Sequence, residues 1–348
     1  MFRLKKNVKR PHFLHFPFLV GNRNRSYFLV SLVFLILIGN SFFGCVNRRE
    51  KIQKLIHELA LWQEGDHRGY SRITNALIRI GKPAVPDLIK TLKDENYSNR
   101  YSIIYVLSRI RDESVIPVFE ELIKKDKEPY IRISAISSLS ELSSKTQPIP
   151  GVLIDALYDE DANVRENVVR NLANFGPQAV PVLVKTLLED KEPSVRKPAA
   201  WHLGYIGDKS TVPKLKKLLN LENHPSVRLK VSTALVRLGD ESALPVVLQF
   251  LKHEDASVRE DTIWALEEIF VYQPALTSQI VFPLIDSLKD EHWTVRRGAA
   301  FLLSRIGCKS AIPSLQDLLK DKDKLVRSEA KEAINKIKAN RAKTSFGY

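Results

Sequence analysis

The pattern in this sequence that most suggests chemistry is a carboxylate that stands six residues before a guanidinium. It occurs as Asp94/Arg100, Asp126/Arg132, Asp159/Arg165, Asp190/Arg196, Asp290/Arg296 and Asp321/Arg327. A carboxylate and a guanidinium form strong, charge-assisted hydrogen bonds with each other and with backbone groups. The spacing places each acid in a turn and each arginine at the start of the next helix. We therefore interpret the pairs as a structural ladder bonded to turn backbone, and not as catalytic carboxylates.

Other residues that support catalysis or metal binding are scattered along the chain. The histidines beyond residue 50 are His57, His67, His202, His224, His253 and His292. They form no HxH or HExxH motif and meet no cysteine cluster at ligand spacing. A glycine-rich phosphate loop and a GxSxG motif are also missing from the sequence. The sequence therefore predicts no metal, no cofactor and no enzymatic activity.

The elements that must position these residues recur with a short period. Prolines recur every 30 to 33 residues, with one step of 38, at Pro86, Pro117, Pro150, Pro181, Pro213, Pro245, Pro283 and Pro313. Proline fits the first turn of a helix, so each proline is expected to open a first helix. A second helix is expected to start near each arginine, with apolar residues three, seven and ten positions later on one face. Such self-similarity is typical of a solenoid, in which each unit buries its apolar face against its neighbours.

The ends and irregularities of the repeats follow from residue type. Glycines that can take positive φ are expected to end second helices, at Gly81, Gly176, Gly207, Gly239 and Gly307. The first repeat has Tyr70 in place of the arginine, which is typical of a terminal cap. The segment between Ile269 and Pro283 inserts about six residues, and insertions in solenoids tend to become loops on one face. We interpret the insertion as a harmless lengthening of the joint, with a loop on one face, often a binding face, as the alternative.

The proline-opened helix, the Asp–Arg spacing and the VRxxAxxxLxxIG form of the second helix, as in residues 295–307, resemble the HEAT-repeat family. The short variant first described in phycobilisome bilin lyases is the most similar, and the resemblance covers roughly residues 50–340. It implies an all-α fold, an α-α superhelix (HEAT-like solenoid) of about nine two-helix repeats over residues 45–340, with the second helices lining the concave surface. The same resemblance implies a chromophore-handling activity as an alternative function.

The candidate binding residues follow from the side of the second helix that the core leaves free. The position five after the arginine faces away from the apolar stripe. Its occupants are Tyr105, Ser137, Arg170, Trp201, Thr233, Trp264, Phe301 and Glu332. Exposed aromatic residues with arginines around them are typical of interaction hot spots. We predict a protein-binding groove across repeats five to eight, formed by Trp201, Tyr205, Trp264, Phe301, Arg297 and Arg305; the alternative is that the rings fold onto adjacent repeats and are half-buried.

The N-terminal segment has the pattern of a secretory signal. Seven basic residues and no acid precede the apolar run YFLVSLVFLILIG, and NSFFGC follows it. We interpret residues 1–44 as a lipoprotein-type signal peptide that leaves Cys45 as the lipidated N-terminus, although Phe42 departs from the leucine usual three residues before the cysteine. An uncleaved signal anchor over 27–46 is the alternative. Both interpretations predict a bacterial envelope protein, membrane-anchored on the extracytoplasmic side.

The remaining composition bears on partners. The chain carries a net charge of +14, of which residues 1–44 supply +7, so the repeats are only mildly basic. Their lysines and arginines alternate with acids, which argues against a nucleic-acid patch. Cys308 would be the one remaining cysteine after lipidation, and we interpret it as a structural residue. The sequence thus predicts a membrane-tethered, non-catalytic scaffold that binds a protein or peptide, with a purely architectural spacer as a further alternative, and a polar tail at 341–348.

Overall fold

The computed structural model describes residues 47–62, 65–94, 97–143 and 148–344, and every regular element in these ranges is a helix. The chain divides into two compact units, Met1–Ile73 and Thr74–Tyr348. The predicted signal segment and Cys45 lie outside the described residues. In the first unit, a helix over residues 47–60 precedes α2 (His67–Ile80), which continues into the second unit. The all-α fold predicted from the repeats is confirmed.

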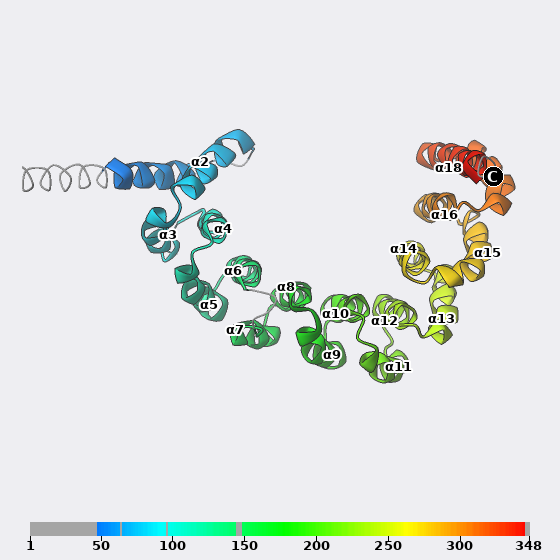
Figure 1. Cartoon of the computed structure of the whole chain (residues 1–348), viewed down its shortest axis with the longest axis horizontal. Coiled ribbons are helices and arrows are strands. Elements are labelled where there is room, and N and C mark those ends of the chain that lie inside the picture. Colours follow the sequence, from blue (N-terminus) through cyan, green and yellow to red (C-terminus); the bar gives the residue numbers. More distant parts are fainter. Residues whose placement is uncertain (1–46, 63–64, 95–96, 144–147, 345–348) are drawn as a thin grey trace, which may run out of the picture. The chain divides into compact units, whose positions relative to one another are not determined.

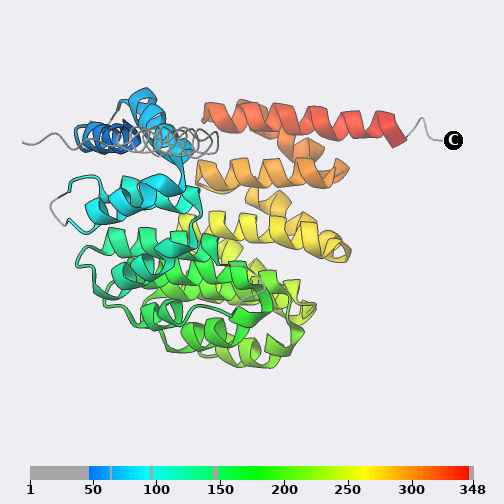
Figure 2. The same ribbon diagram turned by 60° about the vertical axis from the view of Figure 1, so that its left-hand side comes forward.

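The second unit consists of alternating first and second helices (Figure 1). The first helices are α3 (Val85–Leu92), α5 (Ile116–Lys125), α7 (Gly151–Asp155), α9 (Val180–Glu189), α11 (Val212–Leu219), α13 (Leu244–Gln249), α15 (Thr277–Ser287) and α17 (Ile312–Asp317). The second helices are α4 (Arg100–Ile110), α6 (Pro129–Leu142), α8 (Ala162–Leu172), α10 (Pro193–Ile206), α12 (Pro225–Arg237), α14 (Ala256–Tyr272), α16 (Trp293–Ile306) and α18 (Lys324–Thr344). Consecutive second helices pack side by side along one layer of this unit (Figures 1 and 2). We call the surface of this layer that faces away from the first helices the inner face.

Proline and glycine set the helix boundaries as their backbone preferences require. A short 3₁₀ turn precedes most first helices, and a proline occupies one of the first two helical positions of α3, α5, α9, α11, α13 and α17. Gly207 and Gly307 cap α10 and α16 with φ of 81° and 74°, a left-handed conformation that costs a residue with Cβ more than it costs glycine. Arg111 takes the same conformation after α4, with φ of 57°, where the sequence offers no glycine.

The insertion before Pro283 is helical, so the predicted lengthening of the joint is confirmed and the alternative of a loop over residues 271–282 is wrong. Helix α14 continues to Tyr272, and after a 3₁₀ turn at Pro274–Leu276 the first helix α15 begins at Thr277. Pro283 consequently lies inside α15 and does not open it. The extra residues lengthen two helices because they keep buried apolar side chains, at Leu276 and Ile280, that continue the core.

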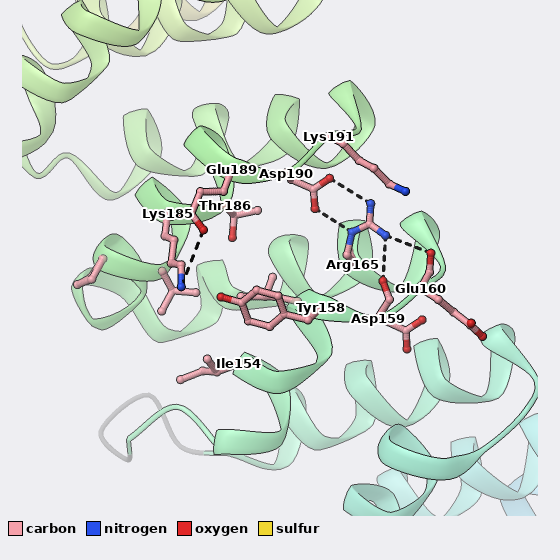
Figure 3. A pocket seen from close by; sticks show the side chains of 13 residues that line it. Ile154, Tyr158, Asp159, Glu160, Arg165, Lys185, Thr186, Glu189, Asp190 and Lys191 are labelled. Carbon is pink, nitrogen blue, oxygen red and sulfur yellow. Dashed lines mark hydrogen bonds and ion pairs between the residues drawn. The ribbon is translucent and has the colours of Figure 1, made fainter.

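The Asp–Arg pairs form a buried ladder, as predicted, but six of the arginines reach the acid of the following repeat. Arg165 donates from Nε and Nη2 to the Asp190 carboxylate at 2.8 and 3.1 Å, and from Nη1 to the Asp159 carbonyl at 2.9 Å (Figure 3). Asp190 Oδ1 in turn accepts from the Glu192 N–H at 2.9 Å. The rungs are Arg100–Asp126, Arg132–Asp159, Arg165–Asp190, Arg196–Glu222, Arg259–Asp290 and Arg296–Asp321.

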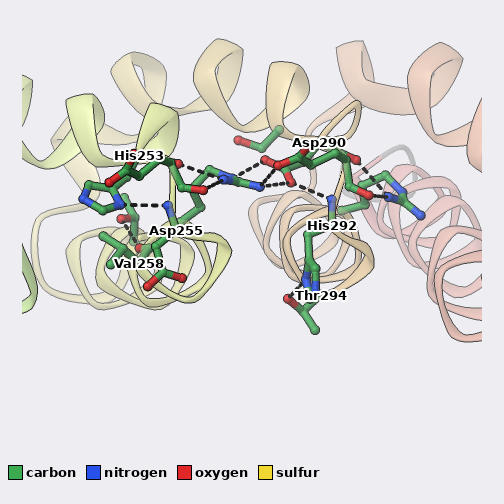
Figure 4. A network of polar contacts seen from close by, with 12 residues as sticks. His253, Asp255, Val258, Asp290, His292 and Thr294 are labelled. Atoms are coloured by element: carbon green, nitrogen blue, oxygen red, sulfur yellow. Dashed lines mark hydrogen bonds and ion pairs between the residues drawn. The ribbon is translucent and has the colours of Figure 1, made fainter.

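The ladder has one interruption within the described residues. The equivalent of the acid before Arg259 is His253, whose Nδ1 accepts from the Asp255 N–H at 3.0 Å, as Asp290 Oδ1 accepts from the His292 N–H at 2.8 Å (Figure 4). Histidine therefore preserves the turn. It offers no carboxylate to the preceding repeat, and Arg228 makes no ion pair among the residues described.

Removing one ladder arginine should destabilise the second unit strongly. Side chains of Arg165 and Asp190 are each only 7% exposed, so Arg165→Ala leaves a buried carboxylate without its partner, at a cost of about 3–5 kcal/mol. Arg327 is exposed, and among the described residues it bonds only to backbone carbonyls of its own turn, so Arg327→Ala should cost below about 1 kcal/mol. Urea denaturation of both variants measures the difference in free energy of unfolding, and equal losses would contradict a structural role for the rungs.

Candidate functional site

Aromatic side chains of the second helices are exposed on the inner face. Trp201 on α10 is 37% exposed, Trp264 on α14 is 46% exposed, and Tyr105 on α4 is 39% exposed. All three occupy the position five residues after the ladder arginine. The prediction that this position faces out of the core is therefore confirmed for these residues.

Thr233 occupies the same position on α12 but is only 2% exposed, so its predicted outward exposure is wrong. Two contacts join α10 to α14 across this helix: Lys197 Nζ lies 2.7 Å from Asp261 Oδ2, and Trp201 Nε1 donates to Glu268 Oε1 at 3.3 Å. These long side chains close over α12. The threonine is small enough to lie beneath them, and its hydroxyl donates to the Leu229 carbonyl at 2.7 Å.

A hollow on the inner face lies between α14, α16 and α18, and we call it the aromatic hollow. It has a volume of about 280 Å³, and its lining includes Trp264, Trp293, Phe301, Arg297, Lys336, Glu260, Glu329 and Glu332. The ring centroids of Trp264 and Phe301 are 6.3 Å apart, with planes tilted by 52°. A Cβ on Gly298 would lie 3.2 Å from Ile263 Cγ2, so glycine permits the close approach of α16 to α14.

A second hollow, between α8, α10 and α12, has a basic lining, and we call it the basic hollow. Its volume is about 510 Å³, and it is lined by Glu166, Arg170, Ser194, Lys197, Pro198, Trp201, His202 and Lys230. Each of its three cations is paired with a carboxylate: Arg170 with Glu166, Lys197 with Asp261, and Lys230 with Glu268. An incoming acid must therefore compete with carboxylates already present.

His202 is a buried histidine that lines the basic hollow. It is 6% exposed, and its Nδ1 has no hydrogen-bond partner among the described residues. Burial, with a smaller contribution from the nearby Arg170 charge, lowers the pKa of His202 to about 4. The ring is therefore neutral at physiological pH and contributes no charge to the basic hollow.

The six residues predicted to form one groove are divided by the structure. Trp264, Phe301 and Arg297 line the aromatic hollow, and Trp201 lines the basic hollow. Tyr205 lies outside both hollows, stacked on Trp201 at 5.4 Å, with the Arg237 guanidinium 5.0 Å from its ring. Arg305 is also outside them and pairs with Glu267.

Sequence reasoning missed two members of the aromatic hollow. Trp293 is not at a position that the repeat pattern marks as outward, but it begins α16 and contributes a wall of the hollow. Glu329 lies two residues after Arg327, a position that the repeat pattern does not mark as outward. Its side chain is 13% exposed and lies 3.6 Å from Arg297 Nε.

A further groove lies in the layer of first helices, between the α7 region and α9 (Figure 3). Its volume is about 580 Å³, and Lys185 Nζ lies 5.4 Å from the centroid of the exposed Tyr158 ring. The sequence analysis did not predict it.

No group of three or more histidine, cysteine, aspartate or glutamate side chains in the described ranges could hold a metal ion. Within the same ranges, no helix is both long and apolar enough to cross a membrane. Cys308 is a free thiol and is half-buried.

Comparison with known proteins adds the following. Residues 54–140, 150–229, 219–277 and 281–346 match the family model of HEAT repeats. The bilin biosynthesis protein RpcF of Synechococcus sp. (strain WH8020) is 32% identical over 103 residues, which are 28% of this chain and 49% of that protein. Protein YibA of Escherichia coli (strain K12) is 25% identical over 148 residues, which are 39% of this chain and 53% of that protein. The chain thus spans about half the length of these curated relatives.

Solved structures show the same fold. The X-ray structure of E. coli YibA superposes with a TM-score of 0.50 and 22% identity, covering 80% of this chain and 99% of that one. The Kap95:Nup1 complex contains a chain that superposes with a TM-score of 0.57 and 11% identity, covering 82% of this chain and 46% of that one. At these identities the likeness concerns the arrangement of helices alone.

The depressed pKa of His202 predicts a specific titration. Histidine has a pKa of about 6.5 in an unfolded chain. Between that pH and about 4, the unfolded state therefore binds a proton at His202 that the folded state does not bind. Stability should therefore fall as the pH drops from about 6.5 towards 4, and the imidazole signal of His202 should not titrate above about pH 5. Histidine NMR across pH 8 to 4 measures this, with His202→Gln to assign the signal. A midpoint near 6.5 would contradict the burial described.

Proposed function

Because this chain belongs to the HEAT-repeat family, with exposed aromatic residues gathered on one layer of its helices, we propose that it is a scaffold that holds a protein segment on its inner face. The observation that carries the proposal is the exposure of Trp201, Tyr205 and Trp264 beside two hollows of that face. Large rings that lose their contact with water on binding are the residues that most often dominate interface energies, at about 2 kcal/mol or more each.

The form of the surface favours a segment of protein over a small metabolite. The aromatic and basic hollows draw on different helices of the same layer, and exposed Tyr205 lies outside both of them. A partner that covers both hollows must extend across α8 to α18. The Kap95:Nup1 structure, which has this fold, is itself a complex of two named proteins.

We further propose that the scaffold is tethered to a membrane by a lipid on Cys45, on the extracytoplasmic side of a bacterial envelope. The support is the sequence alone: a basic leader, an apolar run of signal length and a glycine before the cysteine. The lipid would keep the chain at the membrane that its partners also occupy.

A second candidate function is the handling of an open-chain tetrapyrrole. The similarity to the bilin biosynthesis protein RpcF favours it, at 32% identity over 103 residues. A bilin that remains with the purified protein, visible as an absorption band in the red region, would support this function.

Photo-crosslinking tests the scaffold proposal. A benzoylphenylalanine in place of Tyr205, on the inner face, should give one discrete crosslinked protein in the native cell, whereas the same residue in place of Tyr158, among the first helices, should give none. In the chain that carries benzoylphenylalanine at position 205, replacing Trp201, Trp264 and Phe301 together by alanine should reduce the crosslinked product at least about tenfold. The loss of one strong hot spot already has an effect of this size. Identical crosslinks with and without the triple change would leave the architectural spacer as the better description.

The intact mass of the chain purified from membranes tests the tether. A mature chain that begins at Cys45 and carries added acyl mass is expected, and Cys45→Ala should abolish both processing and acylation. An unprocessed chain would favour the signal anchor, and a soluble chain without modification would contradict tethering.

A further inference from the structure

The aromatic hollow contains one more carboxylate than its internal ion pairs use. Arg297 Nε lies 3.6 Å from Glu329 Oε2, and Lys336 Nζ lies 2.7 Å from Glu332 Oε1. Glu260, the third acid of the lining, has no ion-pair partner among the described residues. The hollow is therefore complementary to one added positive charge. The basic hollow offers no comparable unpaired charge, because each of its three cations is already paired with a carboxylate.

The walls of the aromatic hollow also favour a cation. Trp264 is 46% exposed, while Trp293 and Phe301 are half-buried, so ring surface from all three lines the hollow. The faces of aromatic rings carry negative electrostatic potential, and tryptophan attracts a cation above its face most strongly. Aromatic rings combined with a carboxylate are the common way in which proteins recognise ammonium and guanidinium groups.

The size of the hollow restricts what it can hold. Its volume of about 280 Å³ lies just below the roughly 300–1,000 Å³ typical of sites for drug-sized ligands. A single long side chain is the better fit. Its methylene groups would lie against the rings while the charged end reaches Glu260.

We infer that the aromatic hollow binds a lysine or arginine side chain of the protein segment held on the inner face, with Glu260 as its counter-ion. This inference rests on the proposed scaffold function. It specifies in addition that the partner residue bound between α14, α16 and α18 carries a positive charge. Arg297 and Arg305 offer little to an acidic partner here, because Glu329 and Glu267 pair with them within the protein.

Tryptophan NMR of the intact chain can test the inference directly. The sequence has four tryptophans, so four indole N–H signals are expected, with Trp62 and Trp201 as internal references and Trp264→Phe and Trp293→Phe to assign the others. The probe is the peptide acetyl-Gly-Lys-Gly-amide at millimolar concentration. The signals of Trp264 and Trp293 should shift saturably, whereas those of Trp62 and Trp201 should not move.

Three matched comparisons isolate the charge. The same peptide with Nε-acetyl-lysine, or with glutamate in place of lysine, should leave the Trp264 and Trp293 signals unchanged. Glu260→Gln should weaken binding of the lysine peptide by roughly two- to fivefold, the range for one partly exposed charge pair. Glu241→Gln, which removes an exposed acid from the turn before α13, should leave the affinity as it was.

Several outcomes would overturn the inference. Equal shifts with the acetylated peptide would mean that charge is not recognised, and an unchanged affinity in Glu260→Gln would remove the counter-ion. Shifts with phosphocholine but not with the lysine peptide would assign the hollow to a lipid headgroup. If the lysine peptide does not bind but benzoylphenylalanine at position 205 still crosslinks a partner, this inference fails and the scaffold function stands. If the peptide does not bind and no partner is crosslinked, both fail.

Discussion

The buried arginine that joins most repeats to the next is the interaction on which the rest of the second unit depends. Its guanidinium donates to carbonyls of its own turn and to the carboxylate of the following turn, and that carboxylate accepts the N–H two residues onward. Since a buried charge is costly unless it is fully paired, neighbouring turns are held at one spacing and in one register. The second helices consequently pack side by side, and the outward positions of successive repeats come together on the inner face.

The interruption at Arg228 and His253 shows that contacts on the inner face, as well as the ladder, hold neighbouring repeats together. His253 maintains its own turn but gives the preceding repeat no carboxylate. On the inner face around this joint, Lys197 and Lys230 pair with Asp261 and Glu268 of α14. These exposed or partly exposed pairs contribute less than a buried rung. The joint between α12 and α14 is therefore the place in the second unit where neighbouring repeats are held by surface contacts in place of a ladder rung.

Much of the fold follows from the sequence because it depends on local chemistry. Proline at the start of first helices, glycine at positive φ and the apolar stripe of second helices are properties of single residues and their near neighbours. The helical insertion before Pro283 was not predictable in this way, because apolar residues such as Leu276 and Ile280 find their partners only in the packed core. The burial of Thr233 was missed for a similar reason. It depends on two contacts between distant parts of the chain, Lys197 with Asp261, which are 64 positions apart, and Trp201 with Glu268, which are 67 positions apart. The ring positions of the candidate site were predictable from helical period, but its charge was not.

The charge of the inner face shows why composition alone misleads. Arg297 and Arg305 are prominent in the sequence, yet Glu329 and Glu267 neutralise them in the structure. A partner's carboxylate gains little from a guanidinium that must first release an internal acid, because the new pair replaces one of similar strength. The aromatic surface requires no such replacement of one ion pair by another. Trp201 and Trp264 lose their contact with water on binding without breaking a buried ion pair. If the inner face holds a protein segment as proposed, affinity should therefore come mainly from the rings. The Glu260 carboxylate, which has no ion-pair partner among the described residues, should then act chiefly as a selector between partners that fit the rings equally well.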